Sequence, residues 1–149
     1  MNCKRVCKGE YSGEKIKEEY GGPEYETIAA FGSLCLNNNL PSIALANQKC
    51  NEYGLDTIST GDILAFAMEA TEKGLLKSKI NWGDSKAIVQ TIEKIVDRDG
   101  IGSILSKGLA SLAEEIGGED FSAHVKGMEV PLHEPRAKKG VGLSYATSP

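Results

Sequence analysis

The fold is organised around one stretch, Asn51-Glu52-Tyr53-Gly54-Leu55-Asp56-Thr57-Ile58-Ser59-Thr60-Gly61-Asp62, where two helical patterns meet. Upstream, residues 41–53 predict a helix with a proline in its first turn and Gly54 just past its end. Downstream, apolar residues at helical spacing predict a second helix that ends near Lys73. Oxygens for the free amides of its first turn are offered by Ser59, Thr60 and Asp62. The simplest interpretation is a capped helix-loop-helix, and the alternative is an anion or cofactor site at the helix N-terminus.

The composition predicts one acidic globular domain. The chain has 149 residues and a net charge of -4, with no basic stripe on any expected helix, so nucleic acid and anionic membrane surfaces are not expected partners. No apolar run approaches the roughly 20 residues that span a bilayer. The first residues lack the apolar stretch of a secretory signal, which favours a cytoplasmic location.

Further helices are predicted from apolar periodicity and from glycine stops over residues 28–36, 84–100, 103–116 and 135–145. Residues 9–22 are polar and interrupted by glycines, which predicts a solvated loop or a loose hairpin. We therefore expect a mainly α fold, a multihelical array of roughly six helices with a short extended segment near residues 121–131.

Two cysteines near the start, Cys3 and Cys7, are candidate metal ligands. Neighbouring lysine and arginine residues favour the thiolate, which is the form that binds metal. Zinc and iron-sulfur sites commonly need four ligands, so this pair is either half of a site or has no metal role.

Candidate acid and base groups are few. Glu24 and Glu26 open the helix predicted over residues 28–36, where carboxylates either stabilise the helix dipole or have a functional role. His124 and His133 are the only histidines, and each is either a packed residue or an acid or base near neutral pH.

Four motifs, in this order, resemble the tungsten-containing aldehyde ferredoxin oxidoreductase family. They are Gly22-Pro23-Glu24-Tyr25-Glu26-Thr27, Asn51-x-x-Gly54-Leu55-Asp56-Thr57-Ile58-Ser59, His124-Val125-Lys126-Gly127, and Pro135-Arg136 to Tyr145-Ala146-Thr147-Ser148. The likeness extends along nearly the whole chain, and such an ordered set is much harder to meet by chance than any single motif.

The resemblance implies cofactor ligands. In that family a 4Fe-4S cluster is held by cysteines spaced C-x2-C-x3-C and by a later cysteine, and Cys3 and Cys7 match the second and third. The family's D-x-x-G-L-(C/D) motifs bind the two pterins that hold tungsten, and Asn51, Gly54, Leu55 and Asp56 match the earlier motif. Asn51 departs from it, because an amide both donates and accepts where the family has a carboxylate. The Glu-x-x-His pair that binds a lone iron in some relatives is absent, so no such iron is expected.

The resemblance also implies an activity, the oxidation of small aldehydes to acids at a tungsten or molybdenum bis-pterin centre, with electrons passing through the cluster to ferredoxin. Glu26, in preference to Glu24, would transfer protons near the metal. Residues 1–23 would form a cluster-proximal loop region and residues 24–149 a helical domain resembling the part of the family that binds pterin and cluster. The chain would then be an excised domain or a truncated gene product, inactive alone and without bound cofactors.

Two other classes of function remain open from the sequence. One is a stand-alone helical interaction module without redox activity, and the other is a small metal-binding protein that combines Cys3 and Cys7 of two chains. Apolar surface beside the cofactor turn would also favour self-association into a homo-oligomer.

Overall fold

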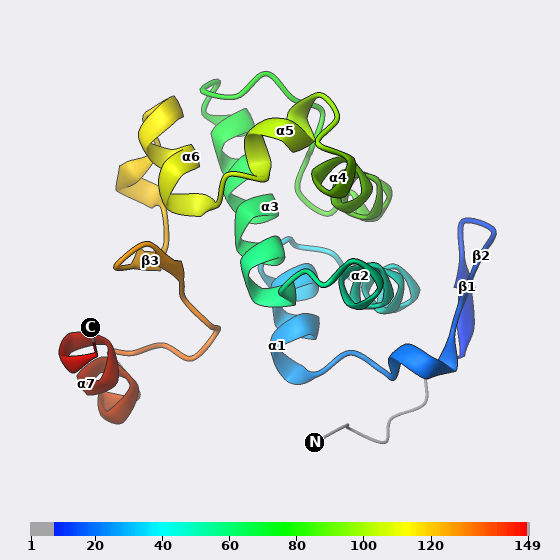
Figure 1. Cartoon of the computed structure of the whole chain (residues 1–149), viewed down its shortest axis with the longest axis horizontal. Coiled ribbons are helices and arrows are strands. Elements are labelled where there is room, and N and C mark those ends of the chain that lie inside the picture. The colour runs from blue at the N-terminus through cyan, green and yellow to red at the C-terminus, as the bar shows by residue number, and fades with distance from the viewer. Residues whose placement is uncertain (1–7, 149) are drawn as a thin grey trace.

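The computed structural model describes residues 8–148, which form an array of helices with two small hairpins (Figure 1). The elements in chain order are β1 (Gly9–Tyr11), β2 (Glu14–Ile16), η1 (Glu18–Tyr20), α1 (Tyr25–Ile28), η2 (Ala29–Ser33), α2 (Leu40–Tyr53), α3 (Thr57–Glu72), α4 (Ser85–Asp97), α5 (Ile101–Leu105), α6 (Leu109–Ile116), η3 (Glu119–Phe121), β3 (His124–Val125), β4 (Met128–Glu129) and α7 (Lys139–Thr147). This architecture confirms the expected mainly α fold. Among residues 8–148, no helix combines the length and the apolar composition needed to cross a membrane.

The junction of α2 and α3 is built by local capping. Asn39 caps α2 by accepting from the backbone N–H of Ser42, and Gly54 ends this helix with a left-handed backbone at φ 70°. Asp56 caps α3 through its carboxylate, which lies 2.8 Å from the backbone nitrogen of Ser59.

The caps predicted for α3 were wrong. The helix begins at Thr57, so Ser59, Thr60 and Asp62 lie within its first turns rather than before it. The hydroxyl of Thr60 donates to the backbone carbonyl of Asp56 at 2.6 Å. Asp56 takes the capping role because its short carboxylate stands three residues before a free amide.

Helix α3 lies at the centre of the array in Figure 1 and carries much of the main core. Its buried Leu64, Phe66 and Met68 belong to the same apolar cluster as Phe31 of η2. From α4, α5 and α6 the cluster takes Ile88, Ile92, Ile95, Leu105, Leu109, Leu112 and Ala113. Gly61 allows α3 to approach η2 closely, because a Cβ there would lie 2.5 Å from the Cβ of Ala30.

The hairpin β1–β2 packs on α2 and α4 through a second apolar cluster, which consists of Ile16, Ala44, Leu45 and Val89 with Tyr11 against it. Lys49 of α2, with a side chain only 5% exposed, is paired with Glu14 at 2.9 Å and with Glu93 at 2.8 Å. Of the two forms expected for residues 9–22, the structure has the hairpin.

Helix boundaries differ from expectation at three places. The helix expected over residues 28–36 begins earlier, with α1, and continues as the wider π-helical turn η2. The segment 103–116 is divided into α5 and α6 by Gly108, whose backbone is left-handed at φ 88°. The last helix begins at Lys139, after a turn at residues 135–137.

The extended segment near residues 121–131 is the antiparallel hairpin β3–β4, with Lys126 and Gly127 at positive φ in its turn.

Candidate functional site

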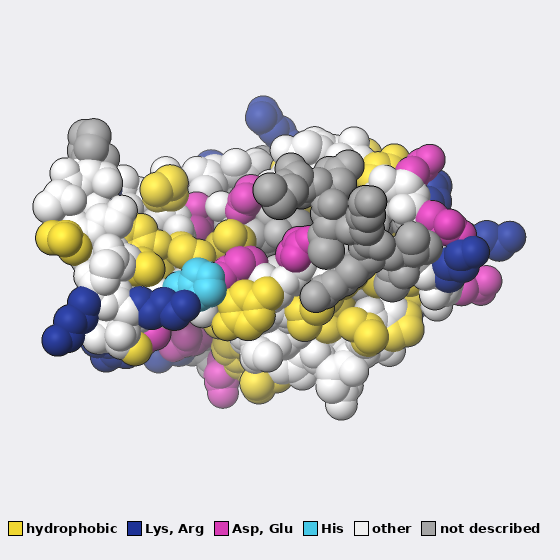
Figure 2. All heavy atoms as spheres, turned by 90° about the horizontal axis from the view of Figure 1, so that it is seen from below, with side chains coloured by type: hydrophobic (Ala, Val, Ile, Leu, Met, Phe, Trp, Pro, Cys, Tyr) yellow, Lys and Arg dark blue, Asp and Glu magenta, His cyan; other side chains and the backbone are white. Residues whose placement is uncertain are grey.

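Three chain segments come together beside the N-terminal end of α3. Thr27 of α1 and Thr57, the first residue of α3, are joined by a hydroxyl hydrogen bond of 2.8 Å. Glu129 of β4 accepts from the hydroxyl of Ser59 at 3.0 Å and from the backbone N–H of Leu109 at 3.0 Å. Figure 2 shows the underside of the molecule, where acidic side chains in magenta, hydrophobic ones in yellow and a basic one in dark blue lie around a cyan histidine. Motifs 30 to 106 residues apart thus share one region.

Glu26 is held by the segment that follows β4. Its Oε2 accepts from the backbone N–H of Leu132 at 2.8 Å. Nε2 of His133 lies 2.8 Å from Oε1, although the imidazole N–H is not aligned to make a hydrogen bond to it. The rings of Tyr25 and His133 stack with centroids 5.6 Å apart. Glu26 is therefore positioned by α1 on one side and by residues 132–133 on the other, with its side chain 21% exposed.

Glu24 has none of the contacts that position Glu26. It occupies the position before α1, is exposed, and caps no backbone amide with its side chain. The structure thus distinguishes the two carboxylates that the sequence placed two residues apart, and only Glu26 contacts the segment after β4.

The residues of the turn 51–56 differ in their exposure and in their hydrogen bonds. The Asn51 side chain folds back on its own helix and donates to the backbone carbonyl of Asn47 at 2.8 Å. Gly54 is exposed, Leu55 is half-buried against the main core, and Asp56 is exposed while its Oδ1 caps α3. The polar groups that this turn offers to a ligand are therefore those of residues 54–56.

A cavity of about 450 Å³ opens beside this turn, within the size range of small-molecule sites. Its polar lining includes Asp56, Ser59, Thr60, Arg98 and Glu129. Its apolar lining includes Leu55, Ile63, Ile95 and Leu105. An apolar wall with a few convergent polar groups is the usual composition of a cofactor pocket.

Several carboxylates lie near Asp62 of α3. Burial and, to a smaller extent, the nearby carboxylates of Glu129, Glu26 and Asp56 raise the pKa of Asp62 to about 7. Each of these three carboxylates therefore lies within electrostatic range of Asp62. Sequence reasoning gave Asp62 only a capping role and gave Glu129 none. No local pattern distinguishes Glu129, because its partners on α3 and α6 are 70 and 20 residues away.

The structure places the two histidines and the cysteines in different environments. His124 lies in β3 with a buried Nδ1 that has no hydrogen-bond partner in the part of the chain that the structure describes, whereas His133 contacts Glu26. Cys3 and Cys7 lie outside the described residues. Burial raises the pKa of both Cys35 and Cys50 to about 12, so these two remain thiols at neutral pH. Within residues 8–148, no three histidine, cysteine or carboxylate side chains are grouped to hold a metal ion.

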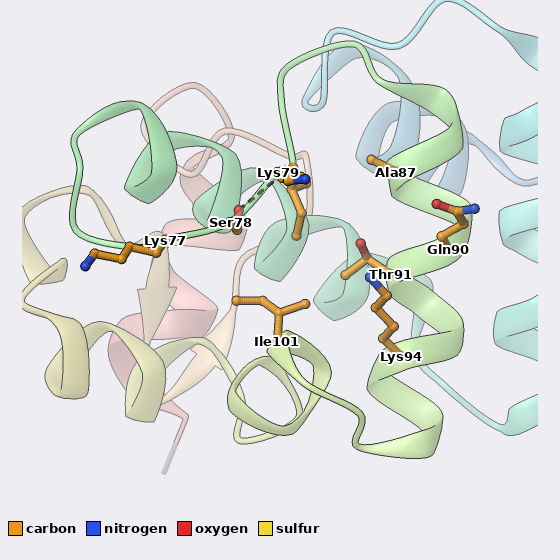
Figure 3. Close-up of a pocket in the computed structure, with 9 residues that line it drawn as sticks. Lys77, Ser78, Lys79, Ala87, Gln90, Thr91, Lys94 and Ile101 are labelled. Carbon is orange, nitrogen blue, oxygen red and sulfur yellow. Dashed lines mark hydrogen bonds between the residues drawn. The ribbon is translucent and has the colours of Figure 1, made fainter.

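A larger cavity of about 730 Å³ lies between α4, α5 and the connector that follows α3. Figure 3 shows the Lys94 ammonium beside Thr91, while the Lys77 ammonium points away from both. None of the predicted site residues that the structure describes lines this cavity, and its lysines do not converge on one point.

Comparison with known proteins agrees with these motifs. The family model described as aldehyde ferredoxin oxidoreductase, domains 2 and 3, matches residues 1–149. The tungsten-containing aldehyde ferredoxin oxidoreductase of Pyrococcus furiosus is 44% identical over 137 residues, covering 87% of this chain and 23% of the relative. That of Thermococcus kodakarensis is 45% identical over 134 residues, covering 85% and 22%.

A more distant relative is the aliphatic sulfonate oxidoreductase, WOR-like subunit, of Pyrococcus furiosus, which is 34% identical over 164 positions, covering 99% of this chain and 26% of the relative. The chain thus spans about a quarter of the length of these curated relatives. The match of the family model along all 149 residues shows that the chain belongs to the aldehyde ferredoxin oxidoreductase family, in the part that forms domains 2 and 3.

Proposed function

We propose that this chain is part of an oxidoreductase that oxidises aldehydes to carboxylic acids at a tungsten or molybdenum bis-pterin centre. The observation that carries the proposal is the 2.8 Å hydrogen bond between Thr27 and Thr57, which joins α1, the helix that carries Glu26, to the residue that follows the turn of residues 51–56. The relatives that support it are named as tungsten-containing aldehyde ferredoxin oxidoreductases.

The turn fits one edge of a pterin. A pterin ring presents amide and amine groups that both donate and accept, and the 450 Å³ cavity offers hydroxyls and carboxylates beside an apolar wall. Gly54, Leu55 and Asp56 would hold it, since the space around Gly54 is open and Asp56 uses only Oδ1 to cap α3. Asn51 would contribute less, because its amide already donates to Asn47. When bound, the metal-pterin group supplies the two-electron acceptor for the oxidation.

Glu26 would accept a proton in this reaction. Oxidation of an aldehyde with one water yields the acid, two electrons and two protons, so a base near the reacting carbon is needed. The backbone N–H of Leu132 occupies Oε2 of Glu26, which leaves Oε1 as the oxygen available to a proton. The imidazole of His133, with a side chain 38% exposed, lies 2.8 Å from this oxygen through its Nε2.

The proposed iron-sulfur function rests on the sequence motif. Cys3 and Cys7 supply two of the four cysteines, and Cys35 and Cys50 do not complete the set because they are buried thiols. The described residues therefore do not form a cluster site, and no step is assigned through one. We propose that residues 1–23 lie near the cluster of the larger enzyme, residues 24–149 form its helical domain, and ferredoxin is the electron acceptor.

A chimera tests the proposal. This chain would replace the corresponding quarter of the Pyrococcus furiosus relative, and the purified protein would be assayed for aldehyde oxidation with a viologen dye after its tungsten and pterin contents are measured. We expect activity in the chimera, and a loss of about 100-fold or more in kcat on Glu26→Gln with metal and pterin contents unchanged. Glu24→Gln is the matched control and should change kcat by less than about threefold, because Glu24 is exposed and does not contact the segment after β4.

Either of two results would overturn the proposal. A fully loaded chimera that keeps normal turnover after Glu26→Gln would remove the catalytic role of Glu26. A correctly folded chimera that takes up neither pterin nor tungsten would show that the turn of residues 51–56 does not serve as a cofactor cradle.

A further inference from the structure

A small cavity lies between α3, α6, η3 and Trp82. Its volume is about 100 Å³, which gives room for a ligand of a few non-hydrogen atoms. Its apolar lining consists of Leu34, Ala65, Phe66, Trp82, Leu109, Phe121 and Ala123. Two carboxylates, those of Asp62 and Glu69, complete the lining.

Asp62 is the unusual group in this cavity. The residue is only 7% exposed, and its Oδ2 has no hydrogen-bond partner within the described part of the chain. Buried polar atoms are nearly always paired in folded proteins, because an unpaired one loses its hydration without compensation. A buried, unpaired carboxylate oxygen at a cavity wall therefore indicates a missing partner.

Charge determines what kind of partner fits. Among residues 8–148, no lysine, arginine or histidine lines the cavity, and the carboxylates of Glu129, Glu26 and Asp56 also act on Asp62. Lys73, near the rim, lies 3.4 Å from Glu69 and 5.1 Å from the ring of Phe121. The field at Asp62 is thus negative, which favours a cation and disfavours an anion.

The residues that line the cavity limit which cation can bind. A metal ion would need more oxygen ligands than two carboxylates on an otherwise apolar wall provide. A primary ammonium needs one carboxylate partner, and aromatic faces such as those of Phe66 and Phe121, which are stacked 4.8 Å apart, can accept its alkyl chain and its charge.

We propose that this cavity binds a primary ammonium carried on a short alkyl chain, with the nitrogen at the carboxylate of Asp62 and the chain against Phe66 and Trp82. The site lies outside the turn proposed for the pterin, and its ligand is neither an aldehyde nor a cofactor. The proposal therefore stands or fails independently of the oxidoreductase function.

The test uses the 149-residue chain and butylammonium. Binding is followed by calorimetry and by the fluorescence of Trp82, which is the only tryptophan and lines the cavity. We expect saturable binding with a Kd in the millimolar range, as suits a ligand of five heavy atoms. Butanol has the same length without the charge and should bind at least about tenfold more weakly.

The matched variants are Asp62→Asn and Asp97→Asn. Asp62→Asn should weaken butylammonium binding at least about tenfold, because the amide carries no negative charge. Asp97→Asn, at an exposed position at the end of α4, should leave the Kd unchanged. The proposal is overturned if butylammonium shows no saturable binding, if butanol binds as tightly, or if Asp62→Asn binds as tightly as the unmodified chain. If Asp62→Asn does not fold, the comparison of butylammonium with butanol on the unmodified chain decides.

Discussion

Replacement of Asp62 by asparagine should stabilise the chain at pH 8. Asp62 is buried on α3 and its Oδ2 has no partner among the described residues, so the ionised carboxylate destabilises the folded state. Asparagine has nearly the same shape and carries no charge, which removes this penalty.

The size of the effect follows from the pKa. Burial, together with the neighbouring carboxylates, raises the pKa of Asp62 from 3.8 to about 7. Each pKa step of one corresponds to about 1.4 kcal/mol, so the charged form costs about 4 kcal/mol in the folded state. The folded state binds the proton more tightly than the unfolded state. The contribution of Asp62 is therefore fully present below pH 3.8 and is lost as the pH rises to about 7.

Urea unfolding at a series of pH values measures this pH dependence of stability. The free energy of unfolding of Asp62→Asn, minus that of the unmodified chain, should grow by about 3 to 4 kcal/mol between pH 4 and pH 8. The exposed Asp97→Asn variant should show no such growth. A difference for Asp62→Asn that stays constant with pH would refute the reasoning, because the buried carboxyl would then titrate as it does in the unfolded chain.

Three further predictions concern packing, thiol reactivity and activity. Gly102→Ala should lower the free energy of unfolding by about 3 kcal/mol or more, because the new Cβ would lie 1.9 Å from the backbone oxygen of Lys94, and thermal unfolding measures this. Cys35 and Cys50 should resist iodoacetamide at pH 8, as read by mass spectrometry, because both are buried and burial raises their pKa to about 12. The 149-residue chain alone should not oxidise crotonaldehyde with a viologen dye, because a bis-pterin centre needs protein groups from both sides.

Each of these has a control and a contradicting result. Gly140→Ala in α7, where a Cβ meets no atom within 4 Å, should cost little, and equal costs at both glycines would contradict the packing argument. Iodoacetamide should label both cysteines once the chain is unfolded in urea, and labelling at the same rate in the folded chain would contradict their burial. Viologen reduction by the chain alone at a rate above that of a heat-treated sample would refute the third prediction.

Local features of the fold were predictable from the sequence because they depend on neighbouring residues. Apolar periodicity and the glycine at the end of α2 identified the central helices, and the extended segment near residues 121–131, which the structure shows to be a hairpin, was expected around its glycine turn. Helix ends were less predictable. The capping role of Asp56 and the break at Gly108 depend on which amides remain free once the helices pack.

For the candidate site, too, some features could be predicted from the sequence and others depend on the tertiary structure. The sequence by itself determined the family motifs, and with them the candidacy of Glu26 and the turn of residues 51–56, since these are ordered patterns of residue type. Only the tertiary structure decided that Leu132 and His133 hold Glu26 across 106 and 107 residues, and that Asn51 folds back on α2. It alone decided that Asp62 is buried without a partner. Contacts between distant segments depend on the packing of whole helices, and the direction in which a helical side chain points is set by that packing rather than by its sequence neighbours.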